Sequence, residues 1–141
     1  MKNINFIDLF SGVGGFSSGL IEAGYKHILS LDNNKYCKDA YDINFPEHKF
    51  ILKDISKLFK EELLGSIGKK KIHLVVGGPP CQGFSTIGKR ISSNESVRNS
   101  KDKRNNLVYE FIRIVEIIQP SVFVMENVRG IKTRENGNIF S

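Results

Sequence analysis

The sequence of 141 residues has no long hydrophobic run and only two cysteines. A helix that spans a bilayer needs about 20 consecutive apolar residues, so we expect no membrane-spanning segment. Asn5 and Asp8 interrupt the apolar stretch at the N-terminus, which is not the pattern of a secretory signal peptide. Cys37 and Cys81 cannot build a disulfide framework, and this favours the reducing cytoplasm.

The composition is that of one ordinary globular domain. Hydrophobic residues make up 40% and charged residues 26% of the chain, which is long enough to bury a real core. The net charge of +6 suits a polyanionic partner, although many basic domains bind nothing of the kind. No set of metal ligands is predicted.

The N-terminal residues have the pattern of a nucleotide-binding βαβ unit. Residues 3–10 read as a strand, followed by a glycine-rich turn and a short helix over residues 17–24, with Gly24 as its C-cap. The dinucleotide fingerprint G-x-G-x-x-G fails, because Ser17 stands in its third glycine position. The glycines therefore form either a ligand loop or a tight turn without a ligand.

Two further strands are predicted to end in carboxylates. Residues 27–32 end at Asp32, 20 residues beyond Gly12, which is about the distance at which an acidic residue accepts hydrogen bonds from ribose hydroxyls. A helix over residues 33–44 follows, with an apolar stripe of Tyr36, Cys37, Ala40 and Tyr41 on which Cys37 packs.

After a strand over residues 50–52, Asp54 either caps a helix over residues 55–64 or accepts a hydrogen bond from an adenine amino group.

Cys81 lies at a rigid corner. A buried strand over residues 72–76 leads into Gly77-Gly78-Pro79-Pro80, where two prolines fix φ and supply no N–H. Such a corner at the C-terminal end of a strand is where ligands bind in open α/β sheets. The cysteine is either a nucleophile or a small buried hydrophobe.

Residues 88–106 are nearly free of large apolar side chains and carry six basic residues against two acidic ones. A loop of this length is either a functional flap that follows phosphates or a solvated disordered segment. Leu107, Phe111, Ile114, Val115 and Ile118 then recur at helical spacing, and a strand over residues 122–125 delivers Glu126.

Asp32, Asp54, Cys81 and Glu126 are thus expected at one edge of a parallel sheet. A glycine-rich loop with two carboxylates suits a cofactor that contains a nucleoside but no pyrophosphate. A thiolate beside a carboxylic acid suits covalent addition to a heterocycle, because the acid can protonate or hydrogen-bond the ring nitrogen.

These motifs resemble the C5-cytosine methyltransferases, which transfer a methyl group from S-adenosylmethionine (SAM) to carbon 5 of cytosine. Residues 8–15 resemble the SAM loop, Pro80-Cys81-Gln82 the catalytic motif and Glu126-Asn127-Val128 the acid motif. The resemblance covers residues 5–129 and implies a Rossmann-like α/β methyltransferase fold. In that fold a mostly parallel sheet has helices on both faces.

The resemblance also implies functional residues. Cys81 would attack cytosine C6, and Glu126 would hold N3 and the exocyclic amine. The implied cofactor contacts are Phe10, Ser11, Gly12, Gly14, Asp32, Asp54, Ile55, Pro80 and Leu107. Those of the substrate, cytosine flipped out of double-stranded DNA, are Gln82, Ser85, Asn127, Lys89 and Arg90.

The family continues well beyond its acid motif, whereas this sequence stops at Ser141. We therefore expect residues 1–141 to be the N-terminal part of a SAM-binding catalytic domain, truncated after the fifth strand. The target-recognition domain and C-terminal motifs would then be absent. A second chain would supply them, or the exposed fifth strand would self-associate.

The expected function is methylation of DNA in a restriction-modification system. A tRNA cytosine methyltransferase of the same framework and a non-catalytic SAM-binding module remain as alternatives.

Overall fold

The computed structural model describes residues 4–80 and 106–127. In chain order its elements are β1 (Asn5–Leu9), α1 (Gly15–Glu22), β2 (Lys26–Asp32), α2 (Lys35–Asn44), β3 (Phe50–Leu52), the 3₁₀ helix η1 (Ile55–Lys57), α3 (Lys60–Ile67), β4 (Leu74–Gly77), α6 (Asn106–Ile118) and β5 (Val122–Met125). None of the helices in these two ranges is long and apolar enough to cross a membrane.

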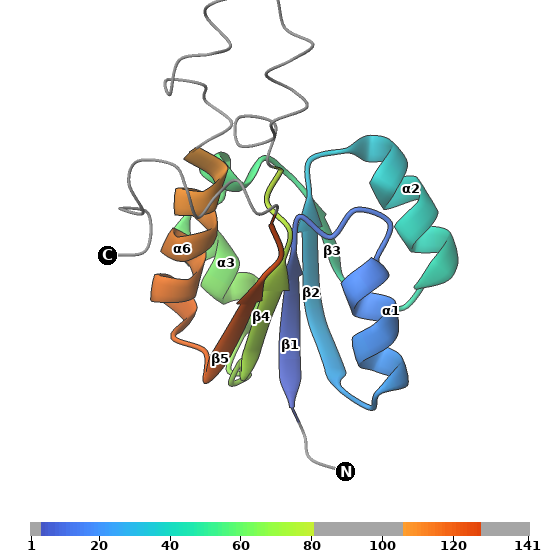
Figure 1. The fold of residues 1–141 in the computed structure, drawn as a ribbon, viewed down its shortest axis with the longest axis horizontal. Coiled ribbons are helices and arrows are strands. Elements are labelled where there is room, and N and C mark those ends of the chain that lie inside the picture. Colours follow the sequence, from blue (N-terminus) through green and yellow to red (C-terminus); the bar gives the residue numbers. More distant parts are fainter. Residues whose placement is uncertain (1–3, 81–105, 128–141) are drawn as a thin grey trace, which may run out of the picture.

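The five strands form one parallel sheet in the order β3-β2-β1-β4-β5. Helices α1 and α2 lie on one side of the sheet, and α3 and α6 lie on the other (Figure 1). The predicted Rossmann-like α/β fold, a parallel sheet with helices on both faces, is confirmed. The strand order reverses between β1 and β4, and ligands of such sheets bind at that point, beyond the carboxyl ends of the strands.

The core is built from the central strands and the helices on the α3 and α6 side. Ile7 and Leu9 of β1, Leu29 of β2 and Phe111 and Ile114 of α6 are all fully buried. Leu107, Val115 and Ile118 pack against this core and are partly buried, so the apolar spacing in α6 was read correctly.

Two local predictions were wrong. The helix expected over residues 55–64 is split into η1 and α3, because Leu58 and Phe59 are extended. Leu58, at this break, packs in the core with 1% exposure. Tyr36 does not join the apolar stripe of α2, because it is 84% exposed whereas Tyr41 is fully buried.

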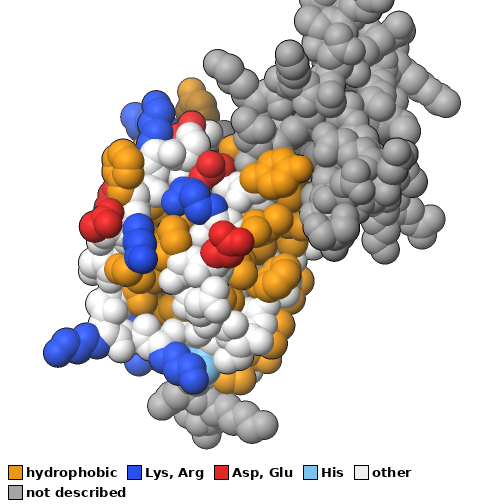
Figure 2. All heavy atoms as spheres, turned by 90° about the vertical axis from the view of Figure 1, so that its left-hand side faces the viewer, with side chains coloured by type: hydrophobic (Ala, Val, Ile, Leu, Met, Phe, Trp, Pro, Cys, Tyr) orange, Lys and Arg blue, Asp and Glu red, His pale blue; other side chains and the backbone are white. Residues whose placement is uncertain are grey.

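Strand β5 is poorly covered. Its residues Val122, Phe123 and Val124 are about half exposed. Figure 2, which views the side of the molecule that carries α6, shows hydrophobic side chains reaching the surface there as a continuous group. On the α1 side a groove of about 550 Å³ lies between α1 and the β4–β5 pair, with Phe16, Leu20, Val76, Val122 and Val124 in its apolar lining.

Candidate functional site

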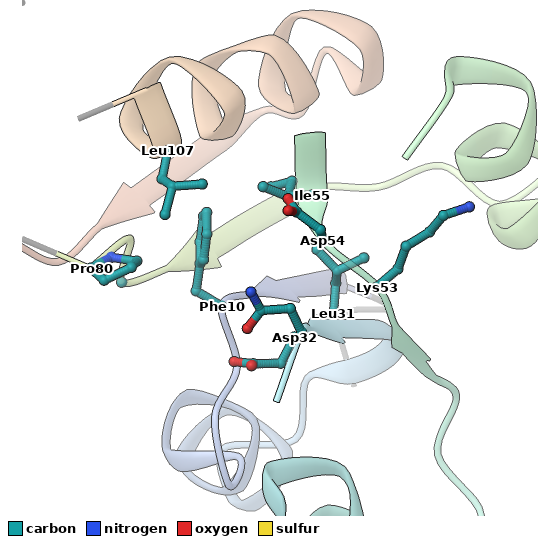
Figure 3. A pocket seen from close by; sticks show the side chains of 10 residues that line it. Phe10, Leu31, Asp32, Lys53, Asp54, Ile55, Pro80 and Leu107 are labelled. Carbon is teal, nitrogen blue, oxygen red and sulfur yellow. The ribbon is translucent and has the colours of Figure 1, made fainter. Parts of the chain in front are cut away.

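A pocket of about 220 Å³ opens at the carboxyl edge of the sheet, beside the switch point (Figure 3). It is lined by residues at or just after the ends of four strands and by the first turn of α6. They are Phe10, Leu31, Asp32, Asn33, Lys53, Asp54, Ile55, Gly78, Pro80 and Leu107. Six of the nine predicted cofactor contacts are among them, namely Phe10, Asp32, Asp54, Ile55, Pro80 and Leu107.

The loop after β1 has an unusual backbone. Phe10, Gly12 and Gly14 have φ values of 55°, 54° and 95°, in the left-handed region. Glycine adopts this region freely, but for a phenylalanine it costs about 1–3 kcal/mol, and such strain gathers at functional sites. Phe10 turns its ring into the middle of the pocket, between the Pro80 and Leu107 side and the Asp32 side (Figure 3).

Asp32 joins the loop to the helix α2. Its Oδ2 accepts the Gly12 N–H at 2.9 Å, and its Oδ1 accepts the Asn34 N–H at 2.9 Å. An ionised carboxylate has about four lone-pair positions, so each oxygen can accept one more hydrogen bond from a ligand. Asp32 is therefore placed both to hold the loop and to accept hydroxyl groups in the pocket.

The opposite wall is formed by Asp54 and Ile55. Asp54 caps η1, because its Oδ1 accepts the backbone N–H of Ser56 at 2.9 Å and its hydroxyl at 2.8 Å. The Ser56 hydroxyl bond and then the backbone bond lower the pKa of Asp54 from its usual value, so the carboxylate stays ionised. Within the described residues its Oδ2 accepts no hydrogen bond, which leaves that oxygen for a ligand.

Arg113 of α6 holds this wall in place. One Nη atom donates to the carbonyl oxygens of Ile55 and Leu58, at 2.8 and 3.2 Å, and Nε donates to Glu110 at 2.7 Å. Because Leu107 lies on the same helix, Arg113 links α6 to the segment that carries Ile55, and both Leu107 and Ile55 line the pocket.

Asn33 and Lys53 line the pocket although they were not predicted to. The available signal was their position, since each is next to a predicted residue at the end of a strand. The Lys53 ammonium group is paired with Glu62 at 2.5 Å and points away from Phe10 (Figure 3). Lys53 therefore contributes the aliphatic part of its side chain to the pocket lining, and its charge is directed elsewhere.

The end of β5 meets the end of β4. The Glu126 N–H donates to Gly77 O at 2.9 Å, and a Cβ atom on Gly78 would lie 3.3 Å from Glu126 Oε2. The Asn127 side-chain amide donates to Pro79 O at 3.4 Å. The Glu126 carboxylate thus lies against the Gly-Gly-Pro-Pro segment, whose Gly78 and Pro80 line the pocket.

The remaining predicted residues fall into two groups. Ser11, Gly12 and Gly14 shape the loop but do not line the pocket, and Ser11 is buried, with its N–H bonded to Leu31 O at 3.1 Å. Cys81, Gln82, Ser85, Lys89 and Arg90 lie outside the described residues. Residues 4–80 and 106–127 contain no group of three or more His, Cys, Asp or Glu that could hold a metal ion.

A family model described as C-5 cytosine-specific DNA methylase matches residues 4–141. The type II methyltransferase M1.HphI of Haemophilus parahaemolyticus is 42% identical over 96% of this chain, and M.DdeI of Desulfomicrobium norvegicum is 41% identical over 91%. The chain spans only about a third of these curated relatives, 35% of the first and 28% of the second.

Solved structures show the same fold. A candidate DNA modification methyltransferase encoded within a prophage (E. coli) superposes with a TM-score of 0.79 at 36% identity, over 97% of this chain and 35% of that one. A DNMT2 mutant of Spodoptera frugiperda is 24% identical and superposes with a TM-score of 0.71, over 98% of this chain and 39% of the DNMT2 chain. At this identity the similarity supports the fold only.

Proposed function

Because the chain belongs to the C-5 cytosine-specific DNA methylase family, we propose that it takes part in methyl transfer from SAM to carbon 5 of cytosine in DNA, within a restriction-modification system. The observation that carries this proposal is the pocket, which brings six predicted cofactor contacts together from separate parts of the sequence. Residues 1–141 would form the SAM-binding N-terminal part of the catalytic domain.

The pocket fits a nucleoside cofactor. Phe10, Leu107 and Pro80 offer apolar surface for a flat ring, Asp32 has acceptor capacity for ribose hydroxyls, and Asp54 has a free oxygen for an exocyclic amine. Ser17 stands where the dinucleotide fingerprint has its third glycine, which argues against a dinucleotide. When bound, SAM would supply an electrophilic methyl group on its sulfonium.

Cys81 and Glu126 would act on the base. The Cys81 thiolate would form a bond to cytosine C6, while Glu126 holds N3 and the exocyclic amine and so draws electron density toward the ring nitrogen. Carbon 5 would thereby become nucleophilic toward the methyl group that bound SAM supplies, with S-adenosylhomocysteine as the leaving group. Loss of the C5 proton to a base then breaks the S–C6 bond and restores the thiolate. The position of Glu126 beside Gly78 supports this pairing, because Cys81 follows three residues later.

Double-stranded DNA is the proposed partner, and the cytoplasm the proposed location. Within the base stack carbon 6 is inaccessible to the Cys81 thiolate, so the target cytosine would be flipped out. Gln82, Ser85 and Asn127 would contact the base, while Lys89 and Arg90 would contact phosphates and add a salt-dependent contribution to affinity.

A further polypeptide segment, from a second chain or a second copy, would cover β5 and the apolar groove beside α1. The exposed Val122, Phe123 and Val124 support this, because uncovered strands at a sheet edge pair with other chains. Sedimentation at rising concentration tests the second copy, for which association is expected. A clean monomer would exclude self-association.

The function is tested by calorimetric titration with SAM and with NAD. We expect SAM to bind and NAD not to bind, and the reverse result would overturn the proposal. Catalysis is tested by incubation with SAM and duplex DNA that contains 5-fluorocytosine, which blocks loss of the group at C5 and traps the adduct. We expect no covalent complex from residues 1–141 alone. After addition of a second polypeptide that supplies the missing motifs we expect a covalent complex, which Cys81→Ser abolishes and the matched Cys37→Ser retains. An adduct with RNA alone would redirect the proposal from DNA to RNA.

A further inference from the structure

Buried polar side chains form a connected set between the sheet and the helices α1 and α2. They are Asp8 of β1, Ser17 of α1, Ser30 of β2 and Tyr41 of α2, all with no exposed surface, together with the half-buried His27. The set lies directly beneath the loop that leads from β1 into α1. The inference drawn from it rests on the proposed binding of SAM at that loop.

Asp8 takes the place of an N-cap side chain for α1. The N-cap of α1 is Gly14, which has no side chain to accept a first-turn N–H. Asp8 Oδ2 instead accepts the Ser17 N–H at 3.1 Å and the Ser17 hydroxyl at 2.7 Å. Ser17 is the third residue of α1, where a cap side chain normally bonds. Asp8 therefore ties the start of α1 to β1, the two ends of the loop.

Tyr41 supports the same loop from α2. A Cβ atom on Gly14 would lie 2.6 Å from the Phe45 ring and 3.0 Å from the Tyr41 ring, so both rings pack against the backbone of the loop. The Tyr41 hydroxyl donates to Ser17 Oγ at 3.2 Å. The ring is itself wedged between Phe45 and Phe50, with centroids 4.7 and 4.9 Å away. Tyr41 thus fixes both Gly14 and the hydroxyl that Asp8 accepts.

The hydrogen bonds of this set share atoms. Tyr41 donates to Ser17 and Ser17 donates to Asp8, while Ser30 Oγ lies 2.8 Å from the Tyr41 hydroxyl and 3.3 Å from Ser17 Oγ. His27 Nε2 lies 2.9 Å from Ser30 Oγ and 3.1 Å from the Tyr41 hydroxyl. The donors end at Asp8, whose Oδ1 has no hydrogen-bond partner within the described residues. Asp8 is therefore required as an acceptor.

We propose that Asp8 and Tyr41 are positioning residues for the cofactor loop, which hold Gly14 and Ser17 so that Phe10 and Asp32 meet in the pocket. Neither residue lines the pocket. Both act through the backbone between Phe10 and Ser17. Their contribution is to keep the loop in its left-handed conformation before a cofactor arrives, which lowers the ordering cost of binding.

The ionisation of Asp8 gives this arrangement a measurable signature. Desolvation raises the pKa of Asp8 to about 6, against the lowering effect of the Ser17 bonds, and the charge of Asp32 on β2 raises it further. The other titratable groups of the set are Tyr41 on α2 and His27 on β2, with the His48 ring packed edge to face against His27. Protonation of Asp8 leaves neutral hydrogen bonds, which are about half as strong as charge-assisted ones.

The test is SAM affinity measured by calorimetry from pH 7.5 to pH 5.5. At pH 7.5 we expect Asp8→Asn to bind about tenfold more weakly, which corresponds to about 1.4 kcal/mol. Tyr41→Phe, which keeps the ring, should bind a few-fold more weakly. The matched control Ser30→Ala removes a hydroxyl of the set but leaves the Asp8–Ser17 bonds, and should stay within twofold of the wild type.

The pH profile separates positioning from a merely structural role. The wild type and Ser30→Ala should lose affinity below about pH 6, whereas Asp8→Asn should show no such loss. Titration of SAM itself affects all variants alike. The proposal would be overturned if Asp8→Asn lost affinity below about pH 6 as the wild type does. It would also be overturned if Ser30→Ala bound SAM as weakly at pH 7.5 as Asp8→Asn does.

A second measurement needs no cofactor. The amide resonance of Ser17 in nitrogen-15 spectra should titrate with Asp8 in the wild type and stay fixed in Asp8→Asn. If SAM fails to bind a chain in which Ser17 titrates, the proposed function fails and the positioning of a SAM loop fails with it. If SAM binds but Ser17 does not titrate, this inference alone is wrong.

Discussion

The Gly12 backbone N–H donates to Asp32 Oδ2 over 2.9 Å, so the carboxylate that ends β2 holds the loop that leaves β1. The sequence reasoning assigned Asp32 to a ligand alone. The structure gives it a second task, because the same side chain also accepts the Asn34 N–H at the start of α2. Removal of Asp32 should therefore affect both the loop and the ligand.

The Asp32→Ala variant should bind SAM more weakly by about 1.5–3 kcal/mol, because it loses charge-assisted hydrogen bonds. Asp32→Asn keeps one acceptor oxygen and should lose less. The control is Asp42→Ala, which removes an exposed carboxylate of α2 that pairs with Lys38. Calorimetry measures all three, and equal affinity in Asp32→Ala and the wild type would contradict the expectation.

Asp8 and His27 should make the free energy of unfolding depend on pH in opposite directions. Burial raises the pKa of Asp8 to about 6 from 3.8, so its contribution to the free energy of unfolding falls as pH rises between these values. Desolvation, with a smaller effect of His48, lowers the pKa of His27 to about 4 from 6.5. Its contribution therefore rises with pH from about 4 to 6.5. The two slopes therefore have opposite signs in the wild type.

Single substitutions should expose each slope. Asp8→Asn should become more stable as pH rises from about 4 to 6.5, and His27→Gln should become less stable between about 4 and 6, each by about 3 kcal/mol. Urea unfolding at a series of pH values measures both. Slopes of the same sign in the two variants would refute this account.

Arg113 should be needed for the wall of the pocket. Arg113→Met removes the donors to Ile55 O and Leu58 O and should lower the free energy of unfolding by about 1–3 kcal/mol. Glu110→Gln, the control, breaks a partly exposed ion pair and leaves those two bonds, so it should cost about 1 kcal/mol or less. Urea unfolding compares the two variants, and a larger loss in Glu110→Gln would show that the ion pair matters more.

The edge of the sheet was predictable from the sequence because strand, turn and helix signals are local. The strands over residues 50–52 and 122–125 have the predicted bounds, and Asp32 and Asp54 lie where the ends of parallel strands must meet. For Asp54 the sequence left capping and ligand binding open. The structure shows the cap and also a free oxygen, so the two readings do not exclude each other.

The support beneath the loop was not predictable, because it depends on which side chains face one another across the sheet. Asp8 within an apolar strand was a signal of a buried carboxylate, but its partner Ser17 is identified by the packing of α1 alone. The break between η1 and α3 was missed for a similar reason. Burial of Leu58 overrides the helical preference of its neighbours.

Gly77 and Gly65 offer a matched pair of substitutions with opposite expected signs. A Cβ atom on Gly77 would overlap the Leu9 carbonyl oxygen and lie 3.1 Å from the Phe111 ring, and Gly77 pairs with Leu9 in the sheet. Backbone atoms of β1 cannot move aside without disturbing the strand that leads into Phe10. We therefore expect Gly77→Ala to lower the free energy of unfolding by about 1–3 kcal/mol.

Gly65 lies in the exposed interior of α3, and no atom lies within 4 Å of the position its Cβ would take. Alanine there removes backbone entropy from the unfolded chain without a clash, so Gly65→Ala should raise stability by about 0.5–1 kcal/mol. Urea unfolding measures both variants. SAM affinity should fall in Gly77→Ala only, because its strand carries Gly78 and Pro80 of the pocket. If neither alanine changed the free energy of unfolding, the close approach of β4 to β1 would not explain why residue 77 is a glycine.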